Sequence, residues 1–168
     1  MRIINIMLGS GKGGIEQAFL DYTEALQLTG HETHAVTRDG AIINAEPVSP
    51  SVIKHTLKRY DLLDISTTLA LRRLISAVQP DAVIAHGNRA FTLSQHALRV
   101  PVPLIGITHN YSIHRLRHAD AVFAITSDLA QRAEVLGMER ARIFRIPNMV
   151  RFSALPRIRS VTASLHIG

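Results

Sequence analysis

The stretch Arg2-Ile3-Ile4-Asn5-Ile6-Met7-Leu8-Gly9-Ser10-Gly11-Lys12-Gly13-Gly14 decides how the rest of the chain is interpreted. Its first seven residues form a nearly continuous apolar run, which is typical of a strand covered on both faces in a parallel sheet. The glycines end this run, and apolar positions then recur at intervals of three and four from Ile15 to Leu26, which predicts a helix. Gly30 ends that helix, and Glu32 to Thr37 predicts a second strand. Residues 1–37 therefore form one βαβ unit.

The alternation of strands and helices resumes after a less regular part of the sequence. That part is expected to hold a short strand at Ala41 to Ala45, a break at two prolines, and a basic segment, Ser51 to Tyr60, of undefined structure. Beyond it the pattern predicts a helix from near Asp64 or Ser66 to Pro80, and then strand 81–86, helix 89–98, strand 103–109, short helix 112–117, strand 120–126, helix 128–136 capped by Ser127, and strand 142–146. This order predicts an α/β fold, a Rossmann-like doubly wound parallel sheet with helices on both faces.

The composition fits one globular domain and excludes several classes of protein. The chain has 168 residues, of which 46% are hydrophobic, and it contains no cysteine. The missing thiols exclude disulfide scaffolds, cysteine-ligated zinc, iron–sulfur clusters and cysteine nucleophiles. No apolar run approaches the roughly 18 residues of a membrane span, and the first residues do not form a signal peptide, so a soluble cytoplasmic protein is expected.

The charge balance is basic, with 19 Lys and Arg against 13 Asp and Glu. This excess suits phosphate-rich partners such as nucleotides, an anionic membrane surface or nucleic acid. Nucleic acid is disfavoured, because no recognised binding motif or aromatic stacking platform accompanies the charge. The basic positions that fall between strands are a solvated face or a membrane-facing one: Lys54, Lys58, Arg59, Arg72, Arg73, Arg115 and Arg117.

The glycine-rich turn is the strongest candidate site, because ligands of open parallel sheets bind beyond the carboxyl ends of the strands. It matches G-x-G-x-x-G at Gly9, Gly11 and Gly14, where backbone without side chains can approach a phosphate at a helix N-terminus. A P-loop is disfavoured because no Ser or Thr follows the lysine. A dinucleotide site would use Asp39 for the ribose, and a tight turn without any ligand is the remaining alternative.

Six segments in register resemble group 1 glycosyltransferases of the GT-B fold, the retaining enzymes of lipopolysaccharide and related glycan synthesis. The glycine turn continues into Glu16 as "GG-x-E", and residues 80–86 are similar to a "P-D-h-h-h-x-H" strand, where h is apolar. The other four segments are residues 30–37, 103–110, 119–127 and 146–148. Met149 and Arg151 depart from the residues that usually follow the last segment. The resemblance covers Met1 to Val150.

This resemblance implies a two-domain, metal-independent enzyme that needs no cofactor, with its active site between two Rossmann-like halves. Residues 1–150 would be the amino-terminal, acceptor-binding half of the GT-B fold, and residues 151–168 an interdomain linker and the start of a truncated carboxy-terminal domain. The fragment would be inactive without the other half. Gly13 and Gly14 would lie against the diphosphate and sugar of a nucleotide-sugar donor, and His109 near the reacting centre. Lys12 could add a phosphate contact or point to solvent.

Polar residues after two other strands are candidates for binding the glycan or lipid-linked acceptor. They are His86, Asn88, Arg89 and Asn110, although the residues after His86 could also simply begin a helix. His31, His34, His96 and His166 are expected on solvent faces or strand edges. His114 and His118 have a ligand-like spacing, but no third ligand accompanies them, so no metal site is predicted.

Two other functions remain open. One is an NAD(P)-dependent oxidoreductase that uses Gly9, Gly11, Gly14 and Asp39. The other is a non-catalytic module that binds a sugar or a nucleotide.

Overall fold

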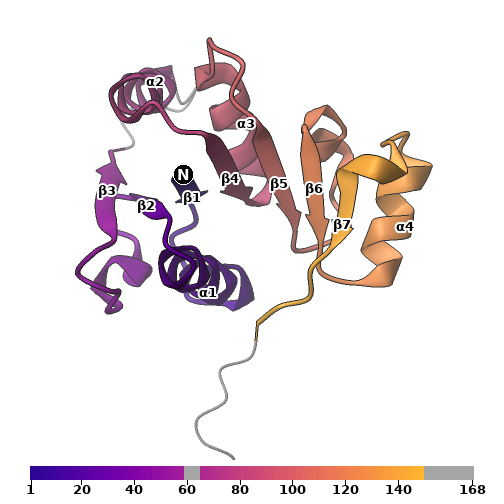
Figure 1. Cartoon of the computed structure of the whole chain (residues 1–168), viewed down its shortest axis with the longest axis horizontal. Coiled ribbons are helices and arrows are strands. Elements are labelled where there is room, and N and C mark those ends of the chain that lie inside the picture. Colours follow the sequence, from indigo (N-terminus) through magenta and orange to yellow (C-terminus); the bar gives the residue numbers. More distant parts are fainter. Residues whose placement is uncertain (59–64, 150–168) are drawn as a thin grey trace, which may run out of the picture.

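The computed structural model describes residues 1–58 and 65–149 of the chain. Its strands all run parallel in one sheet of order β3-β2-β1-β4-β5-β6-β7 (Figure 1). The strands are β1 Arg2–Met7, β2 Glu32–Arg38, β3 Ile53–Leu57, β4 Ala82–His86, β5 Leu104–Thr108, β6 Ala121–Ala124 and β7 Ile143–Arg145. The helices are α1 Gly14–Leu28, α2 Ile65–Val78, α3 Gly87–Ala97 and α4 Ser127–Val135, with short 3-10 helices η1 Ile42–Ala45, η2 His114–His118 and η3 Arg140–Arg142. This is the predicted Rossmann-like α/β fold.

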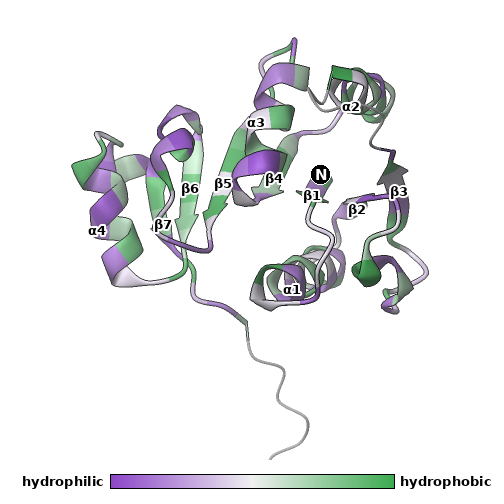
Figure 2. Ribbon diagram, turned by 180° about the vertical axis from the view of Figure 1, so that it is seen from behind, coloured by the Kyte–Doolittle hydropathy of each residue, from purple (hydrophilic) through white to green (hydrophobic). Residues whose placement is uncertain are grey.

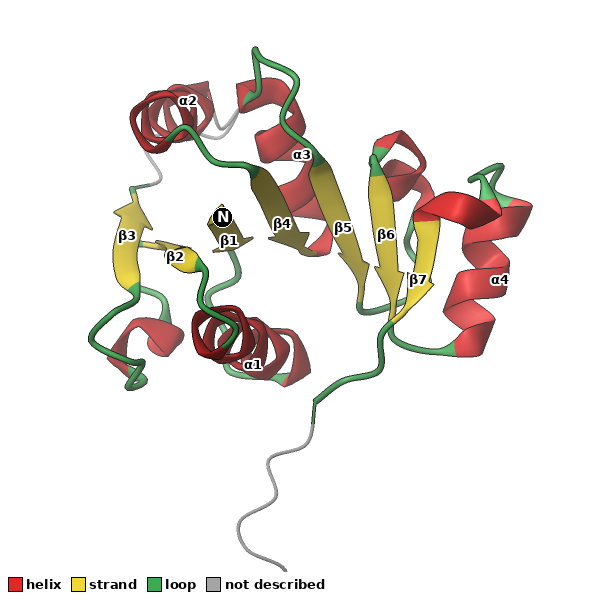
Figure 3. Cartoon of the chain, in the orientation of Figure 1, coloured by secondary structure: helices red, strands yellow, loops and turns green. Residues whose placement is uncertain are grey.

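Helices cover both faces of the sheet, with α1 on one side and α2, α3 and α4 on the other (Figure 3). Alternate residues of one strand serve the two faces. On β4, Val83 and Ala85 join the large core beneath α2, α3 and α4, whereas Ile84 packs with Tyr22 of α1. Figure 2 shows β5 and β6 mainly in hydrophobic colours, with polar residues on the surrounding helices. Burial on both faces explains why these strands appear in the sequence as unbroken apolar runs.

Two expectations concern the region between β2 and α2, of which one is wrong and the other was left open. The short strand expected at 41–45 is wrong, because this segment forms the 3-10 helix η1. The Asn44 amide nitrogen donates to the Arg38 carbonyl at 2.9 Å, and its oxygen accepts from the Thr37 hydroxyl, so the segment turns back onto the end of β2. The part left undefined contains the edge strand β3.

Two smaller expectations were also wrong. The N-cap of α4 is Thr126 rather than Ser127, because the Thr126 hydroxyl oxygen accepts from the Leu129 amide at 3.2 Å. His34 lies buried rather than at a solvent face, since β3 pairs with β2 and brings the His55 ring against it at a centroid distance of 5.2 Å.

None of the helices within residues 1–58 and 65–149 is long and apolar enough to cross a membrane. Residues 151–168, predicted as a linker and the start of another domain, lie outside the described residues, as do residues 59–64.

Candidate functional site

The order of the strands creates a crevice at the carboxyl edge of the sheet. After β1 the chain turns into α1 on one face, and after the neighbouring β4 it turns into α3 on the other face. This divergence is the switch point at which open α/β sheets bind ligands. A cavity of about 300 Å³ lies there, and it is lined by Met7, Leu8, Gly9, Ser10, Ile15, Glu16, Arg38, His86, Gly87, Asn88, Arg89 and Ala90.

The glycine turn wraps around the carboxylate of Glu16, which folds back from the first turn of α1. One carboxylate oxygen accepts from the Gly13 amide at 3.0 Å. A Cβ built on Gly9 would lie 2.6 Å from the other oxygen and 3.0 Å from the Met7 sulfur. Gly9 is therefore a point of close approach, where a side chain would displace these groups.

Gly14 differs, because nothing in the described protein occupies the space that its side chain would fill. A Cβ there meets no atom within 4 Å, and its backbone is outside the left-handed region. The fold thus does not require glycine at this position. The open space lies at the N-terminus of α1, where the helix dipole favours an anion, and the Glu16 carboxylate already accepts from the Gly13 amide there.

A buried chain of hydrogen bonds connects β1, β4 and β5 at the inner wall of the crevice. The Asn5 amide nitrogen donates to the Phe19 carbonyl at 3.1 Å and to the Thr23 hydroxyl at 2.9 Å. The Asn5 oxygen lies 2.9 Å from His86 Nε2, and His86 Nδ1 lies 3.2 Å from His109 Nε2. The two imidazole rings stack with centroids 5.3 Å apart.

These contacts fix which ring nitrogens carry protons. The Thr23 hydroxyl donates to the Phe19 carbonyl at 2.8 Å, so it accepts from the Asn5 nitrogen, and the Asn5 oxygen faces His86. An amide oxygen only accepts, so His86 Nε2 must carry the proton. In neutral His86 the other nitrogen is then an acceptor, and His109 Nε2 must donate to it. Neutral His109 consequently has an unprotonated Nδ1.

The electrostatic environment keeps both rings neutral. Burial, reinforced by the nearby His109, lowers the pKa of His86 well below its usual value. Burial also lowers the pKa of His109 to about 4, against the opposing effect of the Glu16 carboxylate. Phe19 and Tyr22 press their ring edges against His86, with centroids at 5.6 and 5.3 Å. At physiological pH the site therefore presents a neutral, oriented imidazole, that of His109, which is bonded to His86 at the wall of the crevice but is not itself among the lining residues.

The remaining predicted residues lie in more varied settings. Lys12 is exposed, and its ammonium lies 2.6 Å from the Glu46 carboxylate. Asn88 donates to the Ser112 carbonyl at 2.7 Å, and the Asn110 oxygen accepts from the Ser112 amide at 2.9 Å, so both hold the loop after β5. Arg89 lines the crevice. Both ring nitrogens of His86 are engaged within the protein, which leaves neither for the predicted acceptor contact.

The contacts of two side chains at the site could not be predicted from the sequence. Asn5 is the only polar residue inside the buried part of β1, and this interruption of an apolar run was the available signal. Glu16 was named only as part of the "GG-x-E" turn, and the structure shows that it accepts from the Gly13 amide and folds back over that turn. Within the described residues, no three His, Asp or Glu side chains gather as metal ligands would.

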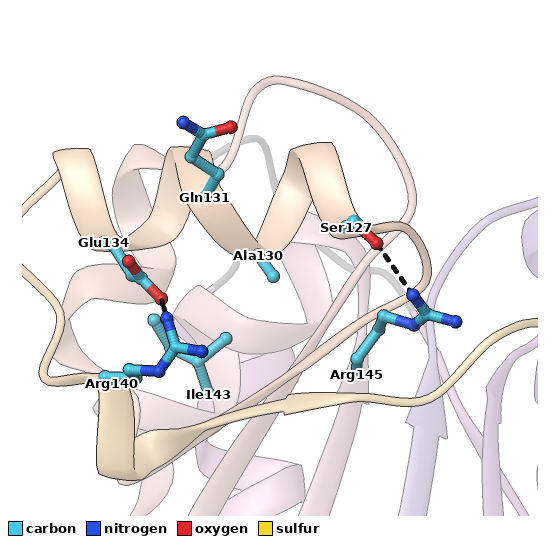
Figure 4. Close-up of a pocket in the computed structure, with 7 residues that line it drawn as sticks. All are labelled: Ser127, Ala130, Gln131, Glu134, Arg140, Ile143 and Arg145. Carbon is cyan, nitrogen blue, oxygen red and sulfur yellow. Dashed lines mark hydrogen bonds and ion pairs between the residues drawn. The ribbon is translucent and has the colours of Figure 1, made fainter.

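A separate cavity of about 450 Å³ lies at the β7 edge of the sheet, away from the switch point (Figure 4). Four of its polar side chains are paired with one another. The Arg140 guanidinium donates to the Glu134 carboxylate at 2.9 Å, and that of Arg145 donates to the Ser127 hydroxyl at 2.8 Å (Figure 4). None of the described residues that line this cavity lines the crevice at the switch point.

The model of Glycosyltransferase Family 4 matches residues 12–153. No curated protein sequence matches the chain. Among solved structures, Anabaena Alr3699/HepE in complex with UDP-glucose aligns with a TM-score of 0.73 and 13% identity over 88% of this chain and 44% of its own. The lipopolysaccharide outer core galactosyltransferase WaaB aligns with a TM-score of 0.69 and 14% identity over 95% of this chain and 50% of its own.

The same fold occurs in the UDP-GlcNAc 2-epimerase from Methanocaldococcus jannaschii, which aligns with a TM-score of 0.63 and 15% identity over 88% of this chain and 45% of its own. The chain thus spans about half the length of these structures. At such identities the likeness shows the fold alone.

Proposed function

The chain belongs to Glycosyltransferase Family 4, and from this premise we propose that it forms the amino-terminal, acceptor-binding half of an enzyme that transfers a hexose from a nucleotide-sugar donor to a glycan or lipid-linked acceptor. The observation that carries the proposal is the neutral His109 held beside an open glycine turn at the switch point. The transfer proceeds with retention at the sugar carbon, and the chain does not turn over without the second half.

The glycine turn is where the donor's diphosphate and sugar lie close to the protein backbone. Gly13 and Gly14 offer backbone without side chains, and the free space at Gly14 supports this role. As the bond to the sugar breaks, negative charge grows on the leaving diphosphate. The amides at the N-terminus of α1 stabilise that charge because they are oriented before the reaction begins.

His109 binds the transferred sugar through its unprotonated Nδ1, which accepts a hydrogen bond from a sugar hydroxyl. A histidine that became charged near pH 7 would lose this acceptor, and the low pKa of His109 prevents that loss. His86 is a positioning residue in this scheme, because it acts on the donor only through His109. Asn88 and Arg89 border the space left for the acceptor, and Asn110 holds the loop beside it. Lys12 would reach a donor phosphate after leaving Glu46.

The basic residues of this half extend the proposal to binding of the enzyme at a membrane surface. Arg72, Arg73, Arg115 and Arg117 are well suited to hold the enzyme on an anionic membrane, where each charge near the surface contributes about 1 kcal/mol. Flotation of the chain with vesicles should then depend on anionic lipid and decrease with salt. Salt-insensitive flotation would contradict this part of the proposal.

An amide NMR titration tests the proposed donor site. UDP-glucose added at millimolar concentration should shift the amides of residues 9–14 and the ring signals of His109 more than glucose alone does. Gly14→Val should remove these shifts while preserving the rest of the spectrum, because its side chain fills the open space without a clash. Unchanged shifts in this variant would refute the assignment.

The same titration distinguishes the proposed donor site from the NAD site of the alternative oxidoreductase function. An NAD site would need an acid at the end of β2 inside the crevice, but Arg38 lines the cavity there and Asp39 does not. NAD⁺ should therefore leave residues 9–14 unshifted. Strong shifts with NAD⁺ and none with UDP-glucose would favour the oxidoreductase.

A further inference from the structure

A second polar cavity, of about 470 Å³, lies between α2, α3 and η2 on the side of the sheet opposite α1. It shares Asn88 and Arg89 with the glycine-turn crevice, so the two spaces adjoin at the beginning of α3. Thr92 and Arg115 continue its wall away from the crevice. A molecule bound in the crevice can therefore extend into this cavity.

The described elements around this cavity are rich in arginine. Residues 65–118, from which all its lining residues come, include six arginines and a single acid, Asp81, whereas Asp61 and Asp64 lie outside the described residues. Asp81 accepts from the Arg2 amide at 2.7 Å and precedes β4, so it lies at the opposite edge of the sheet from the cavity. None of the described residues that line the cavity is an Asp or a Glu.

Two arginines at and near this cavity contact neutral oxygen atoms. The guanidinium of Arg115, which lines the cavity, donates to the Thr92 hydroxyl at 3.1 Å. Arg72 does not line the cavity itself, and its guanidinium donates to the carbonyl of the lining residue His96 at 3.1 Å. The described ion pairs include neither arginine. Such contacts orient a guanidinium without neutralising it, so its other donors and its charge stay available to a ligand.

We propose that this cavity binds a phosphoryl group carried by the acceptor. This inference rests on the proposed function, since it names the chemical class of the acceptor for the same site. Planar guanidinium groups bind phosphate through paired hydrogen bonds, and hydroxyls such as that of Thr92 add neutral donors. The volume exceeds that of one phosphate and lies in the range of small-ligand sites, which leaves room for an attached sugar or lipid headgroup.

Calorimetric titration of the whole chain in 0.15 M salt tests this site, because such salt screens diffuse surface charge. The probes are glucose 1-phosphate, with glucose as its neutral control, and vesicles of phosphatidylglycerol and phosphatidylcholine, with pure phosphatidylcholine as theirs. The proposal expects a phosphate-bearing probe to bind and its neutral control not to bind. Binding of glucose 1-phosphate identifies a phosphorylated glycan, and binding of the anionic vesicles alone identifies a lipid headgroup.

The matched variants are Arg115→Gln and Arg117→Gln, which remove the same charge from the same short helix, although only Arg115 lines the cavity. Arg115→Gln should weaken the binding of glucose 1-phosphate about tenfold, whereas Arg117→Gln should change it less than twofold. On anionic vesicles, to which Arg117 also contributes, Arg115→Gln should still weaken binding more than Arg117→Gln does. Equal losses in both variants, or no binding of either phosphate-bearing probe, would overturn the proposal. UDP-glucose shifts at residues 9–14 should persist in Arg115→Gln, so failure of the phosphate site is distinguishable from failure of the donor site.

Discussion

Replacing Asn5 with leucine should reverse the proton positions along the buried histidine chain. Leucine has the same branching at Cγ but no acceptor for His86 Nε2–H, which the Asn5 oxygen holds at 2.9 Å in a fully buried position. The proton of His86 then moves to Nδ1 and points at His109, whose own proton must move from Nε2 to Nδ1. The acceptor that the site offers to a sugar hydroxyl becomes a donor.

The structure also sets the size of the effect on stability. Asn5→Leu removes two hydrogen bonds made by the amide nitrogen and leaves one buried nitrogen of His86 without a partner. An unsatisfied buried polar group costs about 1–3 kcal/mol, so the free energy of unfolding should fall by about 2 kcal/mol. Urea unfolding measures this loss, and long-range nitrogen NMR of the imidazole rings measures the proton positions.

Thr23→Val is the matched control for this experiment. It breaks the Asn5 to Thr23 contact in the same buried cluster but leaves the Asn5 oxygen on His86. This variant should lose stability while His109 keeps its proton on Nε2. The reasoning is refuted if His109 in Asn5→Leu still carries its proton on Nε2, or if the unmodified chain carries it on Nδ1.

Three further predictions follow from the described contacts. The pKa of His109 is about 4 in the folded chain and near 6.5 in the unfolded chain, so the unfolded state binds more protons between these pH values. The free energy of unfolding should therefore rise with pH across this window. In urea titrations, His109→Gln should make this rise less steep. Thr126→Ala should cost about 1 kcal/mol of unfolding free energy and Ser127→Ala much less, and the reverse order would contradict the cap of α4. Gly106→Ala places a Cβ 2.6 Å from the buried Leu116 side chain, so denaturant unfolding should show a loss of about 1–3 kcal/mol; a neutral result would mean that Leu116 repacks freely.

Much of the fold could be predicted because the sequence patterns are local. A strand buried on both faces leaves an apolar run, as in β1, and an amphipathic helix leaves a stripe, as in α1. The segment after β2 could not be predicted this way. The apolar run at 41–45 resembles a strand, but hydrogen bonds from Asn44 to the end of β2 turn it into η1.

Only the location of the candidate site could be predicted from the sequence, and its hydrogen bonds could not. The rule that ligands bind at the carboxyl edge identified the glycine turn and His109. The hydrogen bonds among Asn5, His86 and His109 depend on the register of β1 against β4 and on the neighbouring β5, which join residues far apart in the chain. No local pattern contains such pairings, so His86 was assigned to the acceptor although both of its ring nitrogens serve the protein.

A crystal structure of the chain soaked with UDP-glucose tests the central claim most directly. The account predicts diphosphate oxygen atoms within hydrogen-bond reach of the backbone amides of Gly14 and of Gly13, with the Glu16 carboxylate displaced from Gly13, and a sugar hydroxyl at His109 Nδ1. Density for the donor elsewhere, as in the hollow between α4 and β7, with the glycine turn empty, would contradict it.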